Sequence, residues 1–344
     1  MKFMVAAAPH AAPIASLSLT MRRVLYALTP AASAHLWFFG AGFAINFLIA
    51  ATAALLAEAA VLKLRHRPTR HALRDGSALV TAALLCFAMP PLVPWWIPAI
   101  GACSAMVLAK HLYGGLGRNL FNPAMVGYVL LLVSFPTEMT QWVPPHIGDL
   151  DYQHLSAAAQ LNYSLTGNLP DDVSIDALTR ATPLDAVKEG ARSGQRFADI
   201  SATSLFGALG GRGWEWINSF IALGGLYLLY TGTVRWQIPL ALLAGLLCPA
   251  TILYLLNAGS YASPGFHLFS GGAILGAFFI ATDPVSAAES NLGRLIFGAS
   301  IGLLTYSIRS WGGYPDGVAF AVLLMNAAVP LIDRYTRPRI YGRS

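Results

Sequence analysis

The segment 177–185 holds the residue types best suited to chemistry in this chain. Thr182 is followed by Pro183 and, three positions after the threonine, by Asp185. Threonine is a preferred N-cap, proline suits the first helical position, and an acidic residue at the third position resembles a capping box. We therefore expect a helix to begin at Thr182 and to stop near Gly190, because glycine is a common helix terminator. The simplest interpretation is a threonine hydroxyl that caps a surface helix.

The same helix start also suits a bound anion. The first N–H groups of a helix lack partners within the helix, and the helix dipole places partial positive charge there. A phosphate esterified to the hydroxyl of Thr182 would lie against these donors. From the residues alone, a structural cap and a phosphate attachment site both stay open.

Three more polar residues stand at predicted helix ends within the apolar part of the chain. Asn119 follows the glycine-rich run Gly114–Arg118, and Asn122 and Asp283 each precede a proline. The glycine spacing matches neither a Walker loop nor a dinucleotide-binding fingerprint, whereas a tight turn with closely packed helices explains it. An ionisable group near membrane depth is a candidate binding group, but Asp283 fits equally well as a helix cap in cytoplasmic water.

The elements that position these residues are apolar segments. The chain is 56% hydrophobic and 11% charged, against about 25% charged in soluble proteins, so it is expected to be an integral membrane protein. The third, fifth and eighth segments fall short of the roughly 20 residues that span a bilayer, and broken helices of this kind line cavities or ligand sites. The predicted helical passes are Arg22–Gly40, Gly42–Leu64, Ser77–Pro90, Trp95–Tyr113, Asn122–Pro136, Trp214–Gly232, Gln237–Leu256, His267–Ala281, Leu292–Arg309 and Val318–Ile332.

The charge distribution predicts the orientation. With the N-terminus in the cytoplasm, most of the 22 basic residues fall on cytoplasmic loops, as the positive-inside rule requires. Both termini are then cytoplasmic, and the polar segment 137–213, with more than half of the 16 acidic residues, lies outside. The basic residues act as topological anchors, so the net charge of +6 does not indicate a nucleic-acid partner.

A similarity between two short stretches of the sequence predicts two inverted halves. Gly76–Ala82 resembles Gly271–Ala277, and these runs open or enter the third and eighth passes, five passes apart. An odd repeat unit inverts the second half, as in many transporters, although small residues at this spacing also serve ordinary helix packing.

The expected fold is an all-α polytopic membrane protein of about ten transmembrane helices in two inverted five-helix halves, some of them short or broken, with a periplasmic loop domain. The expected parts are a cytoplasmic tail 1–21, a membrane half 22–136, a loop 137–213, a membrane half 214–333 and a basic cytoplasmic tail 334–344.

The remaining reactive residue types indicate no further chemistry. The three cysteines lie in apolar runs without metal-ligand spacing, the histidines form no ligand motif, and neither a metal site nor a catalytic residue is expected. The tryptophans near predicted helix ends are expected to form interfacial belts rather than to stack on a ligand; these are Trp95, Trp96, Trp142, Trp214 and Trp216.

Three stretches of sequence carry a resemblance to a known family. They are Gly117–Ala124, Ala181–Asp185 and Thr282–Ser286. With them, essentially the whole chain resembles the D subunit of the Rnf (Rsx) ion-translocating electron-transport complex, and more distantly the B subunit of the sodium-pumping NADH:quinone reductase. The resemblance implies that FMN is joined to Thr182 through a phosphoester by a flavin transferase. Arg180 stands where the general attachment motif has glycine.

The resemblance also implies partners and a second cofactor. A non-covalent flavin, riboflavin in the relative, is implied at an intramembrane site, where Asn119, Asn122 and Asp283 could bind either its ring atoms or a cation. The complex would lie in the bacterial inner membrane among other Rnf-type subunits and lipid, pass electrons between ferredoxin and NAD, and move Na⁺ or H⁺. From the broken helices alone, a passive channel or permease for a small polar solute stays open, as does a purely structural subunit.

Overall fold

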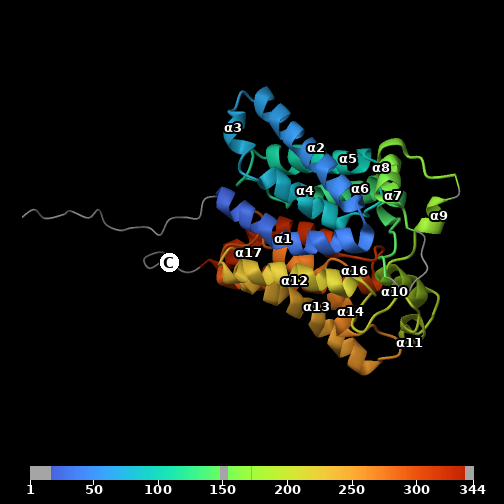
Figure 1. Cartoon of the computed structure of the whole chain (residues 1–344). Helices are drawn as coiled ribbons and strands as arrows, with labels where there is room; N and C mark the ends of the chain where they lie inside the picture. Colours follow the sequence, from blue (N-terminus) through green and yellow to red (C-terminus); the bar gives the residue numbers. More distant parts are fainter. Residues whose placement is uncertain (1–16, 148–153, 172, 338–344) are drawn as a thin grey trace, which may run out of the picture.

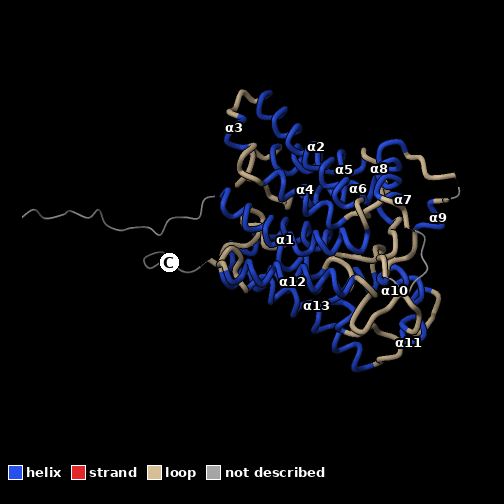
Figure 2. The backbone as a smooth tube through the Cα atoms, viewed as in Figure 1, coloured by secondary structure: helices blue, strands red, loops and turns tan. Residues whose placement is uncertain are grey.

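The protein is helical throughout the part of the chain that the structure describes. The computed structural model describes residues 17–147, 154–171 and 173–337. Within these ranges the only β-type pairing is an isolated bridge between Phe206 and Gly211. Figure 2 shows the helices and the loops that join them. The predicted all-α class is therefore confirmed for the described residues.

The first half of the chain follows the predicted order of helices, with three differences. The short helix α3 (Thr69–Ala72) is not among the predicted passes. The first helix begins before Arg22, because Leu17–Met21 add an apolar turn to it, so these residues do not belong to a tail as expected; residues 1–16 of that tail lie outside the described part. The fourth predicted pass changes from an α-helix to a π-helix along its length. The elements are α1 (Leu17–Phe39), α2 (Gly42–Leu64), α3 (Thr69–Ala72), α4 (Ser77–Ala88), α5 (Trp96–Ser104), the π-helix η1 (Ala105–His111) and α6 (Pro123–Ser134).

Short helices make up the polar segment. They are α7 (Pro136–Thr140), α8 (Ala157–Thr166), α9 (Ile175–Leu178), α10 (Pro183–Arg192) and α11 (Phe197–Ser201). All five gather at one end of the helical bundle, on the right in Figure 1, while α17 (Val318–Thr336) ends at the opposite side. The segment that carries Thr182 is thus separated from the end of α17 by the length of the bundle.

The second half contains one helix that is more broken than its sequence indicated. The predicted pass His267–Ala281 is interrupted at Ser270–Gly272, where Gly271 has φ +70° and Asp316 accepts a hydrogen bond from the backbone of Gly272. The elements are α12 (Trp214–Tyr230), α13 (Gln237–Leu256), α14 (Pro264–Phe269), α15 (Ala273–Leu275), the π-helix η2 (Gly276–Ile280), α16 (Asn291–Trp311) and α17 (Val318–Thr336).

Three of the helices in the described part of the chain are long and apolar enough to cross a membrane. They are α2, α13 and α17. Large apolar side chains point outward from α2 and α13, where Leu48, Leu240 and Leu255 are 65%, 58% and 78% exposed. Such a surface suits hydrocarbon better than water, since apolar patches of this extent are rare on soluble monomers. The crossing of the membrane by all ten predicted passes stays a prediction.

The two halves share a packing order. In the first half α2 packs on α5 and α5 on α6, and in the second half α13 packs on α16 and α16 on α17. The halves meet through α1 with α12 and through α6 with α17. Figure 1 shows the first half and the second half as two adjoining groups of helices. This repetition agrees with two related halves, and the inverted orientation of one of them stays a prediction.

Candidate functional site

Thr182 is the N-cap of α10, as its sequence predicts. Its Oγ1 donates to Asp185 Oδ2 at 2.6 Å, and the backbone N–H of Asp185 donates to that Oγ1 at 3.2 Å. The N–H of Thr182 also donates to Asp185 Oδ2, at 3.0 Å, which completes a capping box. The predicted stop at Gly190 is wrong, because α10 continues to Arg192. Gly190 instead allows a close approach, since a Cβ there would overlap the side chain of Ile200 of α11.

A lysine anchors α10 to the end of α16. Lys188 Nζ donates to the backbone carbonyls of Ile308, Arg309 and Tyr314 at 3.0, 3.3 and 2.5 Å. These include carbonyls that the helix end leaves without partners, and a cation suits the negative end of the helix dipole. Burial is the main cause that lowers the pKa of Lys188, and the three carbonyl contacts stabilise its charged form. The anchor fixes the start of α10 against the second half.

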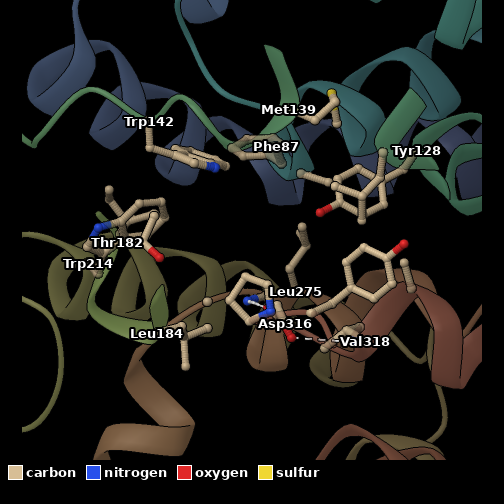
Figure 3. Close-up of a pocket in the computed structure, with 18 of the residues that line it drawn as sticks. Phe87, Tyr128, Met139, Trp142, Thr182, Leu184, Trp214, Leu275, Asp316 and Val318 are labelled. Carbon is tan, nitrogen blue, oxygen red and sulfur yellow. Dashed lines mark hydrogen bonds between the residues drawn. The ribbon is translucent and has the colours of Figure 1, made fainter. Parts of the chain in front are cut away.

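Thr182 lies on the wall of a large cavity between the two halves. The space between its walls, open solvent included, measures about 1060 Å³, and the centre of a water-sized sphere can reach about 120 Å³ of it. Figure 3 shows Phe87, Met139 and Tyr128 on one side and Thr182, Leu275 and Val318 on the other. The half-buried hydroxyl of Thr182 therefore stands where a group attached to it can enter the cavity.

Aromatic side chains form much of the wall. The rings of Trp142 and Trp214 meet edge to face, with centroids 5.1 Å apart, and Trp214 also contacts Phe39 at 5.4 Å. Both tryptophans line the cavity, so our expectation of interfacial belts is wrong for these two. Trp142 and Trp214 lie near helix ends, as the sequence predicts, but their side chains line the cavity. Trp95 and Trp216, with exposed fractions of 49% and 59%, agree with the expectation.

The loop before Thr182 is hydrogen-bonded to a residue of the same wall. The N–H of Arg180 donates to the carbonyl of Trp142 at 2.9 Å, and the Arg180 guanidinium donates to the carbonyls of Asp176 and Thr179. These contacts turn the guanidinium toward its own loop. Arg180, which stands where the motif implied by the family resemblance has glycine, therefore bonds the preceding backbone rather than the hydroxyl of Thr182.

Polar residues that the sequence analysis passed over complete the cavity. Asp316 accepts from the N–H of Gly272 at 2.7 Å and from Arg309 Nε at 3.2 Å. The break between α14 and α15 is therefore stabilised by hydrogen bonds to a carboxylate that is itself paired with an arginine. His35 of α1 and Asn218 of α12 are buried and also line the cavity. Each lies in a largely apolar helix that also holds other polar residues, such as Ser33 of α1 and Ser219 of α12, so its position in the sequence did not distinguish it.

Asn119, Asn122 and Asp283 come together in a second cluster, as the broken-helix pattern suggested. Asn122 caps α6 by accepting from the N–H of Met125 at 3.2 Å, and its Nδ2 donates to the carbonyl of Ile280 at 3.1 Å. Asn119 lies beside Asp283, and its Oδ1 is buried without a partner among the described residues. Because Ile280 also lines the large cavity, the cluster and the cavity share one wall.

The cluster also joins the two halves. Asn326 Oδ1 of α17 accepts from the N–H of Asn122 at 3.1 Å, and Asn326 Nδ2 donates to the carbonyl of Ser286 at 3.0 Å. Ser286 Oγ in turn donates to Asp283 Oδ2 at 2.7 Å. Asn122 is thereby used in structural contacts, and both oxygens of Asp283 accept hydrogen bonds, from Val285 N–H and Ser286 Oγ, so Asn119 Oδ1 is the oxygen of these three side chains that has no partner among the described residues.

The glycine-rich run before Asn119 forms a turn. Gly114, Gly115 and Gly117 have φ of +116°, +104° and +90°, a region that other residues rarely adopt. The tight turn expected of this run is confirmed, but the close helix packing expected of its glycines is not found at Gly115 and Gly117, where an added Cβ would meet nothing within 4 Å.

A buried charged group lies elsewhere in the first half. Lys110 Nζ donates to Glu58 and to Ser77 Oγ, and His111 Nε2 lies 3.3 Å from Glu58 Oε1. Glu58 and Lys110 are almost fully buried. The sequence does not reveal this group, because its residues are far apart in the chain and meet only when α2, α4 and η1 pack together.

Comparison with known proteins gives a family for this fold and site. Residues 4–342 match the model of the NQR2, RnfD, RnfE family. The chain belongs to this family. It is 49% identical over 345 residues to the D subunit of the ion-translocating oxidoreductase complex of Aeromonas salmonicida, with 99% of each chain covered. The D subunits of this complex from Aliivibrio salmonicida and Escherichia coli O81 are 49% and 48% identical, again over 99% of each chain. The family resemblance seen in the sequence is therefore confirmed over the whole length.

Proposed function

We propose that this chain is the membrane-embedded D subunit of an ion-translocating oxidoreductase complex of the Rnf type, and that it carries FMN on Thr182. Its relatives of equal length bear that subunit's name. The observation that carries the flavin proposal is the position of the Thr182 hydroxyl on the wall of an aromatic-lined cavity. The complex would lie in the bacterial inner membrane with both termini of this chain cytoplasmic and the segment 137–213 outside, and a flavin transferase would attach the FMN.

The residues of the cavity fit a flavin. Rings at the wall, such as Phe87, Trp142 and Trp214, can pack against a planar aromatic group, and the few polar groups can fix its orientation. FMN supplies one- and two-electron transfer when bound. The protein supplies an attachment point, walls that exclude water, and a rigid start to α10 that is anchored by Lys188.

One feature of the site must change when a phosphoester forms. The capping box uses the N–H groups of Thr182 and Asp185, and the Asp185 carboxylate lies 2.6 Å from Oγ1. A phosphate on that oxygen would repel the carboxylate, so Asp185 turns away and leaves the N–H groups at the helix start to the phosphate.

The second cluster supports a role in ion or flavin binding. Asn119 Oδ1 and Asp283 offer oxygen atoms of the kind that bind a cation or an N–H group. We propose that Asp283 takes part in the movement of Na⁺ or H⁺ that accompanies electron transfer, and that riboflavin or a cation binds beside it.

The alternative function, a passive channel for a small polar solute, finds less support. A path for a polar solute needs polar groups along its whole wall, whereas much of this wall is apolar or aromatic, with Phe87, Leu132 and Ile217 among its residues. A cavity that combines such a wall with the hydroxyl of Thr182 suits an attached aromatic cofactor better.

The flavin proposal is tested by substitution of Thr182. The full-length chain is produced in a host that has the flavin transferase and is run on a denaturing gel under ultraviolet light. We expect a fluorescent band that is lost in Thr182→Ala, because that variant has no oxygen to form the phosphoester.

Thr179→Ala is the matched control. It removes a nearby hydroxyl that donates to the carbonyl of Ile175, and its band should stay fluorescent. A dark wild-type band would reject the flavin proposal and favour the channel, and measurable solute flux would distinguish that channel from a purely structural subunit.

A further inference from the structure

One residue of the cavity wall has a buried hydrogen-bond acceptor that no described residue uses. Asn218 of α12 is 1% exposed and lines the cavity. Its Nδ2 donates to the carbonyls of Trp214 and Phe269, both at 3.1 Å. A carbonyl oxygen can only accept, so these two contacts fix which end of the amide is nitrogen. Asn218 Oδ1 must therefore point to the other side, where it has no partner among the described residues.

An acceptor of this kind indicates a missing donor. Buried polar atoms are nearly always hydrogen-bonded, because an unpaired one loses its contact with water without compensation. Other buried amides share part of this arrangement: Asn46 Nδ2 donates to the carbonyls of Pro90 and Pro91, and its Oδ1 is also without a partner among the residues described. Asn46 does not line the large cavity, whereas Asn218 does. The coincidence of a fixed, unpaired acceptor with a large cavity is what distinguishes Asn218.

The required ligand must donate a hydrogen bond from a largely apolar aromatic body. The ring system of a flavin meets this condition, because its imide N–H is a donor on the edge of a planar aromatic group. An oxidised quinone has only acceptor groups and would leave Asn218 Oδ1 unpaired. The cavity wall already contains Trp214, one turn before Asn218 on α12, which can cover a ring face.

We propose that Asn218 Oδ1 accepts a hydrogen bond from the imide N–H of the flavin, and that it is the positioning residue that orients the ring and sets its reduction potential. This inference rests on the proposed attachment of FMN to Thr182. The partial negative charge of Oδ1 beside the ring opposes the addition of electrons, so its presence lowers the midpoint potential of the flavin.

The test makes the same substitution, asparagine to leucine, at two positions. The full-length flavin-loaded chain is purified as wild type, Asn218→Leu and Asn46→Leu, and the covalent flavin is titrated by its visible absorbance. We expect a higher midpoint potential in Asn218→Leu and an unchanged one in Asn46→Leu, with equally fluorescent gel bands in all three proteins. Equal potentials in Asn218→Leu and wild type, with fluorescent bands, would overturn this inference and leave the attachment of FMN standing. A dark wild-type band would overturn both.

A second measurement covers the case in which Asn218→Leu does not fold. The wild-type protein alone is examined by vibrational spectroscopy of the flavin in H₂O and D₂O, since bands that depend on the imide N–H report its hydrogen bond. Bands typical of a hydrogen-bonded imide support the inference, and bands typical of a free imide contradict it. The milder variant Asn218→Ser should shift these bands.

Discussion

Thr182 and Asp185 hold each other in position at the scale of single residues. Three hydrogen bonds of 2.6 to 3.2 Å join them in the capping box. The same atoms are those that a phosphoester would rearrange, because Oγ1 is both the cap and the proposed attachment point. In the proposed function, Thr182 would therefore serve the start of α10 before modification and the cofactor after it.

Removal of Asp185 tests this arrangement in the protein without flavin. Asp185→Ala should weaken the first turn of α10 by about 1 kcal/mol, the usual value of an N-terminal cap. We expect faster amide hydrogen exchange in Pro183–Ala186, measured by mass spectrometry. Asp199→Ala is the control, because the pair of Asp199 with Arg196 is exposed and contributes little to stability. Unchanged exchange at the start of α10 would show that the capping box does not hold it.

At the scale of elements, the contact between α13 and α16 depends on the close approach of their two backbones. A Cβ at Gly302 would overlap the carbonyl oxygen of Leu242, and one at Gly245 would overlap that of Ala299. Small residues at such contacts are typical of helix pairs in membranes. α16 also carries Arg309 and receives Lys188, so this pair of helices supports both the cavity wall and the start of α10.

A larger residue at Gly302 should force the two helices apart. Gly302→Val is expected to destabilise the protein by about 1–3 kcal/mol, because the obstacle is backbone and cannot rotate away. The measurement is the apparent melting temperature of the purified protein in detergent, which should fall. Gly313→Val, at a position where a Cβ meets nothing within 4 Å, should melt close to wild type. Equal melting of the two variants would contradict the close contact.

At the scale of the whole molecule, the two halves enclose the cavity and share the polar cluster. The chain of contacts from Asn122 through Asn326 and Ser286 to Asp283 crosses from one half to the other. Ile280 lies between the cluster and the cavity. The cluster therefore adjoins the cavity wall at Ile280, and this contact is the basis on which we propose the coupling.

Substitution of Asp283 tests that coupling in the reconstituted complex. Asp283→Asn removes the negative charge and keeps the shape, so redox-driven uptake of Na⁺ or H⁺ into vesicles should fall several-fold. The fluorescent band at Thr182 should persist, which separates loss of transport from loss of the cofactor. Asp199→Asn, on the exposed loop, should transport as wild type does. Undiminished uptake in Asp283→Asn would remove this residue from the ion path.

The sequence predicted the elements better than it predicted the site. Helix starts at Ser77, Pro123 and Gln237 agree with the structure because polar caps, prolines and hydropathy act locally. The break at Ser270–Gly272 was not foreseen, since its cause is a hydrogen bond to Asp316, which lies far along the chain. In the site, Thr182 was identified from its neighbours, whereas Asn218 and His35 were missed because single polar residues in apolar helices show no pattern of their own.

By itself, the sequence determined the helical class, the order of the helices, the family and the threonine that caps α10. These follow from hydropathy, local capping chemistry and motifs, all of which depend on residues close together in the chain. The tertiary structure alone decided that Thr182 faces a cavity, that Trp142 and Trp214 line it, and that Asn218 presents an unpaired acceptor there, with no partner in the described residues. Those relations join segments far apart in the sequence, and only the packing of the two halves against each other brings them within reach.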